Sequence, residues 1–395
     1  MSRLNVSNLF NENEDGSPVV SGISTFSSPY YFVPPSGSTA QRPQDPGEGQ
    51  LRFNTDSGHL EYYNSELWVD VIVNNNNLGG GLNGIGTTAS TGGTGTRGLI
   101  AGGYAPSPGD LIDRIEYITI STLGNTQDFG NLVAATRLAG SCASSTRGLF
   151  GGGASPAPTK TAKIDFINIA STGQTAGDFG NLITTRNQLA ACSNSTRGLF
   201  SGGDAPSAIT EVIEAVTIAS TGTCEDFGDL QDATEQPASC ANSVRGLVAG
   251  GSNPAINNII SYVTISSIGN ALDFGDLITK RTFFASCSNP TRGLFAPGYN
   301  SPDTTKLNSV EFVTIATTGN AQDFGDLTVE RRAGQAACSS PTRGVFAGGQ
   351  GGPSDDFLNV IDCIEILSTG NAVDFGDLIG TTSQNMGCSN GHGGL

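Results

Sequence analysis

The segment CSSPTRGVFAGG, residues 338–349, recurs in near copies about every fifty residues along most of the chain. Each copy combines a small-residue run that contains a cysteine, a short polar turn, an Arg-Gly pair and an apolar run that usually ends in two glycines. A unit of this length buries its apolar faces only against its neighbours, so the repeats are expected to fold together. The repeated arginines are Arg97, Arg147, Arg197, Arg245, Arg292 and Arg343.

A second marker, the triplet Asp-Phe-Gly, follows each Arg-Gly pair. Each repeat holds four short, β-branched or small-residue runs closed by Gly, Ser or Asn, and this pattern predicts four strands rather than helices. We expect the arginine to brace a loop carbonyl or a carboxylate, and the phenylalanine to fill the gap between neighbouring sheets. The phenylalanines are Phe129, Phe179, Phe227, Phe274, Phe324 and Phe375.

The two ends of the repeat region are out of phase. The first Arg-Gly strand follows the polar stretch TTASTGGTGT (87–96), whereas the last cysteine strand, NMGCSN (385–390), has no full Arg-Gly strand after it. We therefore expect the C-terminal strand to pair with the strand that begins at Arg97, which leaves no open sheet edge. The predicted fold is all-β: a six-bladed β-propeller of four-stranded blades over residues 97–395, closed by the C-terminal strand.

The chain has 8 cysteines, and six of them occupy the same place in successive repeats. Equivalent residues of stacked sheets lie roughly 10 Å or more apart, whereas a disulfide needs Cα atoms within about 7 Å. These residues are therefore predicted to be buried thiols rather than disulfide, redox or metal groups. They are Cys142, Cys192, Cys240, Cys287, Cys338 and Cys388; Cys224 and Cys363 lie outside the series.

The N-terminal quarter has a different composition. Residues 46–73 predict a small β-hairpin module, because apolar and polar residues alternate on both sides of the turn NTDSGH and Trp68 follows. Such a small sheet is marginal alone, so it is expected to pack on another copy or on a host structure. Residues 1–45 are interpreted as an extended leader, and the Gly/Asn-rich residues 74–96 as a flexible linker.

Three stretches resemble known families. GQLRFNTDSGHLEYYNSELW (49–68) resembles a module found near the N-termini of tailed-phage virion proteins, and VSGISTFSSPYYFVPPSGSTAQRP (20–43) resembles the leader of structural proteins from cyanobacterial myophages. The repeats resemble kelch-like propellers, although Phe129 and its equivalents stand where kelch repeats usually place Trp and the usual Tyr is inconsistent.

These resemblances imply a phage virion protein of the fibre, whisker or spike type, assembled in the host cytoplasm. Its N-terminus would join other virion proteins, and a homo-oligomer, with a trimer favoured, is expected. The leader residues expected to dock on the virion are Phe26, Tyr30, Tyr31, Phe32, Pro34 and Pro35. A disordered tail is the alternative interpretation of this leader.

Composition limits the partners. The formal net charge is −17, which argues against nucleic acid or an anionic membrane as the main partner, because both repel an acidic surface. No apolar run is long enough to span a bilayer, and MSRLNVSNLF is too polar for the core of a secretory signal. A soluble protein made in the cytoplasm is expected, with no membrane insertion.

No catalytic, cofactor-binding or metal-binding residue is assigned, and no cofactor is expected. The only histidines are His59 and His392, which disfavours a zinc site or a Ser-His-Asp arrangement. Six copies of Asp-Phe-Gly at fixed spacing exclude a kinase. The acidic runs ENEDG (12–16) and DLQDATE (229–235) and the pair Asp355-Asp356 are interpreted as solvated loop charges, with a glycosidase pair as the alternative.

Two further alternatives stay open. Asp or Asn follows each triplet, which suits turn capping, with a calcium site as the other interpretation. The loops after the Gly pairs vary most between repeats and are either recognition loops or inert turns. The predicted function is a non-enzymatic virion protein that displays its propeller for host-surface or glycan recognition. The alternatives are a decoration or joint protein that binds other virion proteins, and a glycan-cleaving propeller enzyme.

Overall fold

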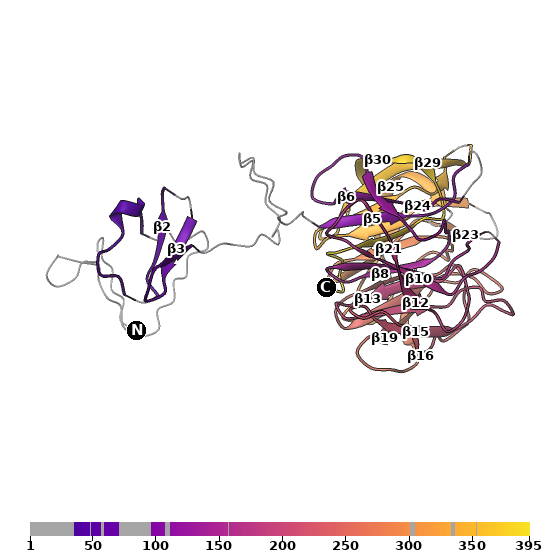
Figure 1. Ribbon diagram of the computed structural model, residues 1–395. Coiled ribbons are helices and arrows are strands. Elements are labelled where there is room, and N and C mark those ends of the chain that lie inside the picture. Colours follow the sequence, from indigo (N-terminus) through magenta and orange to yellow (C-terminus); the bar gives the residue numbers. More distant parts are fainter. Residues whose placement is uncertain are drawn as a thin grey trace, which may run out of the picture. The chain divides into compact units, whose positions relative to one another are not determined.

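The computed structural model of the chain describes residues 35–47, 49–56, 59–70, 96–106, 111–156, 158–300, 305–332, 336–352 and 354–395. Contacts divide the chain into two units, Met1–Asn75 and Asn76–Leu395, and each is considered by itself (Figure 1). Apart from the 3-10 turn η1 (Thr39–Gln41), the described elements are strands, so the all-β class is confirmed. A helix with the length and apolarity needed to cross a membrane is absent from the described residues.

The N-terminal unit is a four-stranded sheet in the order β1-β2-β3-β4. β1 (Ser36–Gly37) runs parallel to β2 (Leu51–Asn54), and β3 (His59–Tyr63) pairs antiparallel with both β2 and β4 (Trp68–Asp70). β2, β3 and β4 therefore lie within residues 46–73, where the sequence predicted a hairpin module. The domain boundaries remain predictions, because the leader up to residue 34 and the linker up to residue 95 lie outside the described residues.

This small sheet buries its polar side. Arg52 Nη1 lies 3.0 Å from Glu61 Oε1 in the buried layer, and Asn54 also hydrogen-bonds Glu61. A hydrogen bond from Arg42 lowers the pKa of Glu61. The apolar side is open, since Leu51 is 42% and Phe53 37% exposed. Apolar and polar side chains of β2 thus lie on opposite faces of the sheet, as the sequence alternation predicts. The polar face is buried and the apolar face is exposed to solvent.

The repeat region consists of six antiparallel groups of four strands. The first has β31 (Met386–Ser389), β5 (Arg97–Ala101), β6 (Arg114–Thr119) and β7 (Gln127–Asn131). The second has β8 (Gly140–Ala143), β9 (Arg147–Gly151), β10 (Lys163–Asn168) and β12 (Gly177–Asn181). The third has β13 (Ala190–Ser193), β14 (Arg197–Ser201), β15 (Val212–Thr217) and β16 (Glu225–Asp229).

The other three groups follow the same order. The fourth has β17 (Ala238–Ala241), β18 (Arg245–Ala249), β19 (Ile259–Thr264) and β20 (Leu272–Asp276). The fifth has β21 (Ala285–Ser288), β22 (Arg292–Ala296), β24 (Thr305–Thr314) and β25 (Gln322–Arg332). The sixth has β26 (Ala336–Ser339), β27 (Arg343–Ala347), β29 (Asp356–Glu365) and β30 (Val373–Thr382).

Three short strands extend these groups. β11 (Gln174–Thr175) pairs in parallel with β7, and β23 (Tyr299–Asn300) pairs with β24. β28 (Gln350–Gly351) pairs with both β25 and β29, so the fifth and sixth groups share one ten-stranded sheet. In every group the third strand carries an irregularity opposite the Asp-Phe-Gly triplet, which bends the outer pair of strands.

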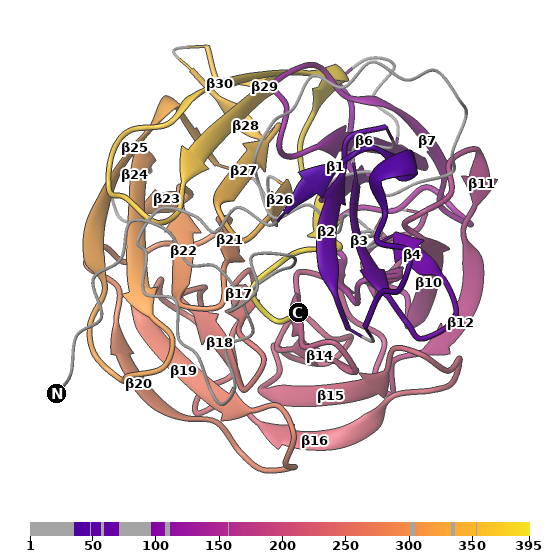
Figure 2. The same cartoon turned by 90° about the vertical axis from the view of Figure 1, so that its left-hand side faces the viewer.

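The two ends of the repeat region meet in the first group. β31 pairs antiparallel with β5, from Met386 opposite Ala101 to Ser389 opposite Gly98, as the sequence predicted. The first strands of successive groups contact one another in the order β31, β8, β13, β17, β21, β26 and back to β31. Figure 2 shows the groups following one another around the C-terminus. No group therefore lacks a neighbour on either side.

Cysteine and glycine fit together where the groups meet. A Cβ added to Gly98 would lie 2.4 Å from Cys338 Sγ, and one added to Gly148 would lie 3.1 Å from Cys388 Sγ. The same contact recurs at the other four junctions, always with the cysteine of one group against the glycine of the next. All eight cysteines are free and buried, which was predicted for the six that recur in the repeats. The Arg-Gly glycine is therefore required by the neighbouring thiol.

We expect Gly98→Ala to lower the free energy of unfolding by about 1–3 kcal/mol, because the new methyl group overpacks against Cys338 Sγ. Removing that sulfur in Gly98→Ala/Cys338→Ala should return part of the loss. Urea denaturation of the two single variants and the double variant measures the coupling. Gly148→Ala, with its longer contact, is the control and should cost less. Strictly additive effects of the two substitutions would contradict this packing.

Candidate functional site

The residues expected to dock on the virion lie almost entirely outside the described part of the chain. Phe26, Tyr30, Tyr31, Phe32 and Pro34 belong to the undescribed leader. Pro35 is described, and its carbonyl accepts a hydrogen bond of 2.8 Å from Phe53 N. The docking role of this set therefore stays a prediction.

The repeated arginines form a circuit between groups. Nη1 of each arginine donates to the carbonyl of an isoleucine just past the third strand of the next group, at 2.6 to 3.4 Å. Arg97 thus reaches Ile169, and Arg343 in the sixth group returns to Ile120 in the first. Of the two expected partners, a carbonyl is used at all six junctions. Arg343 also contacts the carboxylate of Glu365 in its own group.

The triplet phenylalanines lie in six buried apolar clusters, one at each junction. Phe129 packs with Phe150 and Ile169 of the second group, and Phe375 packs with Ile118 and Ile120 of the first. All six rings are at most 3% exposed. A backbone hydrogen bond also joins each of these phenylalanines to the next group. The phenylalanine carbonyl accepts it from the turn glycine of that group, as in Gly173 N to Phe129 O. The expectation that these rings fill the gap between sheets is confirmed.

Three buried ion pairs were not foreseen. Arg186, Arg281 and Arg331 are fully buried and pair across junctions with Glu214, Glu311 and Asp362 respectively. Burial lowers the pKa of all three guanidinium groups, and that of Arg331 to about 10. The sequence does carry a signal: at this place three repeats have Arg and the other three have Thr, the threonines being Thr136, Thr234 and Thr382.

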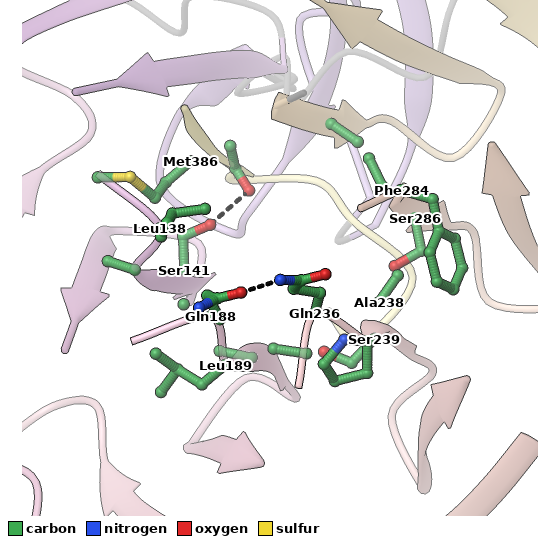
Figure 3. A pocket seen from close by; sticks show the side chains of 18 of the residues that line it. Leu138, Ser141, Gln188, Leu189, Gln236, Ala238, Ser239, Phe284, Ser286 and Met386 are labelled. Atoms are coloured by element: carbon green, nitrogen blue, oxygen red, sulfur yellow. Dashed lines mark hydrogen bonds between the residues drawn. The ribbon is translucent and has the colours of Figure 1, made fainter. Parts of the chain in front are cut away.

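An axial channel runs between the first strands of the six groups. Its wall, at the level that two compartments share, is formed by the residue before each cysteine: Ser141, Ala191, Ser239, Ser286, Ala337 and Gly387. These residues are small because six strands converge there. The wider compartment on one side of this level holds about 690 Å³, part of it open solvent, and Figure 3 shows its lining.

The mouth of this compartment is built from strained backbone. The residue four places before the cysteine has φ between +57° and +61° at Leu138, Gln188, Gln236 and Gln384, and +51° at Phe283. Left-handed backbone is uncommon for residues other than glycine. Backbone hydrogen bonds connect neighbours around the mouth, such as Gln236 N to Gln188 O at 2.8 Å. The sequence offered no sign of this feature, because none of these residues is typical of such a conformation.

The variable loops surround the same mouth. The residue before each left-handed residue forms a bridge with the first residue after a Gly pair or its equivalent, for example Asn187 with Asp204 and Thr282 with Tyr299. Loops and channel therefore open on one face. The opposite face carries Arg97, where β5 begins. It also carries Asn390, whose side chain accepts a hydrogen bond of 2.7 Å from Arg97 N. In Figure 1 the C-terminus lies at one side of the strands of the repeat region and β23 lies at the other.

The C-terminal residues cross the second end of the channel. His392 Nε2 lies 2.7 Å from Ala143 O, and Gly393 N donates to Ser288 O at 2.9 Å. A Cβ on Gly394 would lie 1.9 Å from Ser193 O, so only glycine fits there. The tail GHGGL thus connects the second, third and fifth groups, a role that its length and composition did not suggest.

The contact between His392 and Ser193 is not a catalytic pair. His392 Nε2 faces a carbonyl and must carry its proton, so it has no lone pair for the Ser193 hydroxyl 3.4 Å away. Nδ1 accepts from Gly394 N at 3.1 Å rather than donating to a carboxylate. Burial also raises the pKa of the Cys192 and Cys388 thiols to about 12, which prevents thiolate formation. Among the described residues no His, Cys, Asp and Glu cluster is arranged to hold a metal ion.

Comparisons with known proteins give no relative: neither a protein-family model nor a curated protein sequence matches this chain.

We expect Arg281→Thr to lower the free energy of unfolding by about 3–5 kcal/mol, because it leaves the Glu311 carboxylate buried without its partner. The double variant Arg281→Thr/Glu311→Ser should recover a large part of this loss. Thr234 and Ser261 occupy the two equivalent places at the junction of the third and fourth groups, so the chain itself supplies the matched pair. Chemical denaturation measures both variants. A double variant as unstable as the sum of its parts would argue against the ion pair.

The tail predicts a pH dependence. Burial lowers the pKa of His392 below its ordinary value of 6.5, so the folded protein binds this proton less readily than the unfolded chain. The stabilisation from neutral His392 is complete above the unfolded pKa and is lost as pH falls through the folded pKa. From about pH 7.5 to about pH 5, the melting temperature of the native protein should fall further than that of His392→Gln. Equal falls would contradict the assignment.

Proposed function

We propose that residues 97–395 form a six-bladed, kelch-like β-propeller, and that the chain is a structural protein of a tailed-phage virion. In this proposal the chain is a fibre, whisker or spike component whose N-terminus docks on other virion proteins, in a homo-oligomer for which a trimer is favoured. The propeller is presented for recognition of a glycan or protein on the host surface. The protein is not an enzyme in this proposal.

The closed ring of strand groups supports the assignment of a propeller fold. Six groups with the same strand order repeat the same junction contacts, and the sixth group makes them to the first through Arg343 and Ile120. The pairing of β31 with β5 gives the first group the same four strands as the others. A repeat that returns to its own beginning is the defining property of this architecture.

The placement of the two faces is the observation that carries the display role. The repeat region begins at Arg97 on the face crossed by the C-terminal residues, whereas the variable loops and the channel mouth lie on the opposite face. A head held from the first face therefore presents its most variable surface away from its attachment. Several such heads on one particle would act through avidity, so each contact needs only modest affinity.

The chemistry of the described residues favours binding over catalysis. The described wall of the wider compartment carries amides and hydroxyls without an ionisable group, and the single histidine of the repeat region is held by backbone atoms at both ring nitrogens. Paired carboxylates at glycosidase spacing would have to lie in a cleft. Instead, Glu214, Glu311 and Asp362 form ion pairs with buried arginines.

We expect a variant lacking residues 1–45 to keep the melting transition of the repeat region but to be absent from purified phage particles. The same variant, added in excess to host cells, should block phage adsorption as well as the full chain does, because the head is retained. Immunoblotting of particles and counting of unadsorbed phage measure the two properties.

Each alternative gives a different result. Normal incorporation of the truncated chain would overturn the anchor assignment. Failure of both proteins to block adsorption, with binding to purified virion proteins instead, would replace the recognition role by a decoration or joint role. Release of reducing sugar from host polysaccharide, abolished by one carboxylate substitution, would establish an enzyme.

A further inference from the structure

We propose that the channel compartment at the mouth is a binding site for one neutral sugar ring, such as the terminal residue of a glycan. This inference rests on the proposed recognition role and locates it in the channel rather than in the variable loops alone. The compartment is walled by six first strands and opens on the loop face, while the C-terminal residues cross the other end of the channel. A ligand therefore enters from the loop face.

The absence of charge in the lining limits the ligand. None of the 21 described residues that line the compartment is Asp, Glu, Lys, Arg or His, although the chain as a whole carries a charge of −17. An ionised ligand would lose its hydration there without gaining a partner of opposite charge. The site thus favours a neutral molecule, and the net negative charge of the chain disfavours anionic sugars further.

Polar groups at the mouth match a hydroxyl-rich ligand. Gln236 Nε2 donates to Gln188 Oε1, Gln236 Oε1 accepts from Thr282 Oγ1 at 3.0 Å, and Gln384 Oε1 accepts from Arg137. These bonds fix the amides and leave the Nε2 groups of Gln188 and Gln384 without a partner among the described residues. Figure 3 shows Gln188 and Gln236 meeting at the compartment. Fixed amides with free donors suit the lone pairs of sugar hydroxyls.

The wall and rim complete the recognition set. Ser141 Oγ donates to Gly387 O at 2.9 Å, which leaves its lone pairs as acceptors, and no described residue hydrogen-bonds the Ser286 hydroxyl. Phe283 at the mouth is stacked against Tyr299, with ring centroids 5.9 Å apart and an interplanar angle of 23°. The held ring offers an apolar face for the C–H side of a sugar. Donors, acceptors and an aromatic surface thus converge on one small space.

Backbone strain at the mouth supports the same conclusion. Five residues that are not glycine adopt left-handed conformations at the one place where their side chains surround the opening. Such conformations persist only where the surroundings hold them, and they gather at ligand sites. Gln188, Gln236 and Gln384 are among these residues and line the compartment, and Figure 3 shows the amides of Gln188 and Gln236 facing each other.

The test uses the full chain and free monosaccharides. Glucose, galactose, mannose, fucose and N-acetylglucosamine are titrated by ligand-observed NMR, with glucuronic acid as the anionic comparison. We expect at least one neutral sugar to bind with a Kd on the order of 1 mM, and glucuronic acid not to bind. Absence of saturable binding by all five neutral sugars would overturn the inference.

Two pairs of variants locate the site. Ala191→Phe places a large ring at the level that both compartments share and should abolish binding, whereas Ala191→Ser introduces the residue that three other repeats already carry there and should preserve it. Gln236→Leu removes one amide at a place where Leu138 stands in another repeat, and it should weaken binding about tenfold. Melting curves verify that each variant is folded.

The outcomes separate this inference from the proposed function. Sugar binding that survives Ala191→Phe would place the site elsewhere and overturn the inference. Blocking of phage adsorption by the full chain without any monosaccharide binding would leave the recognition role standing and remove the channel site. Monosaccharide binding that disappears in Ala191→Phe together with adsorption blocking would support both.

Discussion

Closure of the repeat region is the constraint on which the rest of the structure depends. The pairing of β31 with β5 joins residues almost three hundred positions apart and gives the first group the same neighbours as every other group. Each junction then has the same contacts: an arginine on a carbonyl, a phenylalanine between sheets and a thiol against a glycine. Without closure one junction would be missing, and two sheet faces would be exposed to solvent.

These contacts also explain why some positions have the same residue in every repeat, whereas other positions differ from repeat to repeat. A methyl group at Gly98 or its equivalents would crowd the neighbouring thiol, and the triplet glycines approach the turn of the next group, as Gly180 approaches Gly222. Where the structure describes the loops after the Gly pairs, their contacts with a neighbouring group use long side chains, such as Lys160 with Asp204, so these loops vary more in length and composition. Strict positions thus build the ring, and variable positions gather on the face where the channel opens.

The junctions are alike in shape but different in electrostatics. Three use a buried arginine with a carboxylate, and at the third-to-fourth junction Thr234 and Ser261 stand in the two equivalent places. A buried ion pair is weak evidence for stability, because desolvation offsets most of its attraction. Its value lies in specificity: Arg281 satisfies Glu311, whereas a threonine in its place would leave that carboxylate buried alone. Pairs of this kind favour the correct order of otherwise similar groups.

The sequence by itself determined the strands, the all-β class and the return of the last strand to the first. Strand identity depends on local alternation and turn residues, and the phase difference between the cysteine strands and the Arg-Gly strands required the pairing of residues 386–389 with 98–101. It also indicated that Cys142 and its equivalents stay unpaired, since their spacing keeps them apart.

Only the tertiary structure decided which atoms meet across the ring. The partner of Arg147 lies 71 residues away, the ion pairs join residues about thirty apart, and His392 meets a strand 249 residues earlier. The left-handed backbone at Gln188 and Phe283 is imposed by the convergence of strands on one axis, against the local preference of those residues. Periodicity is a local property and therefore visible in a sequence, whereas a channel is made of equivalent positions from all six groups and exists only when the chain has closed.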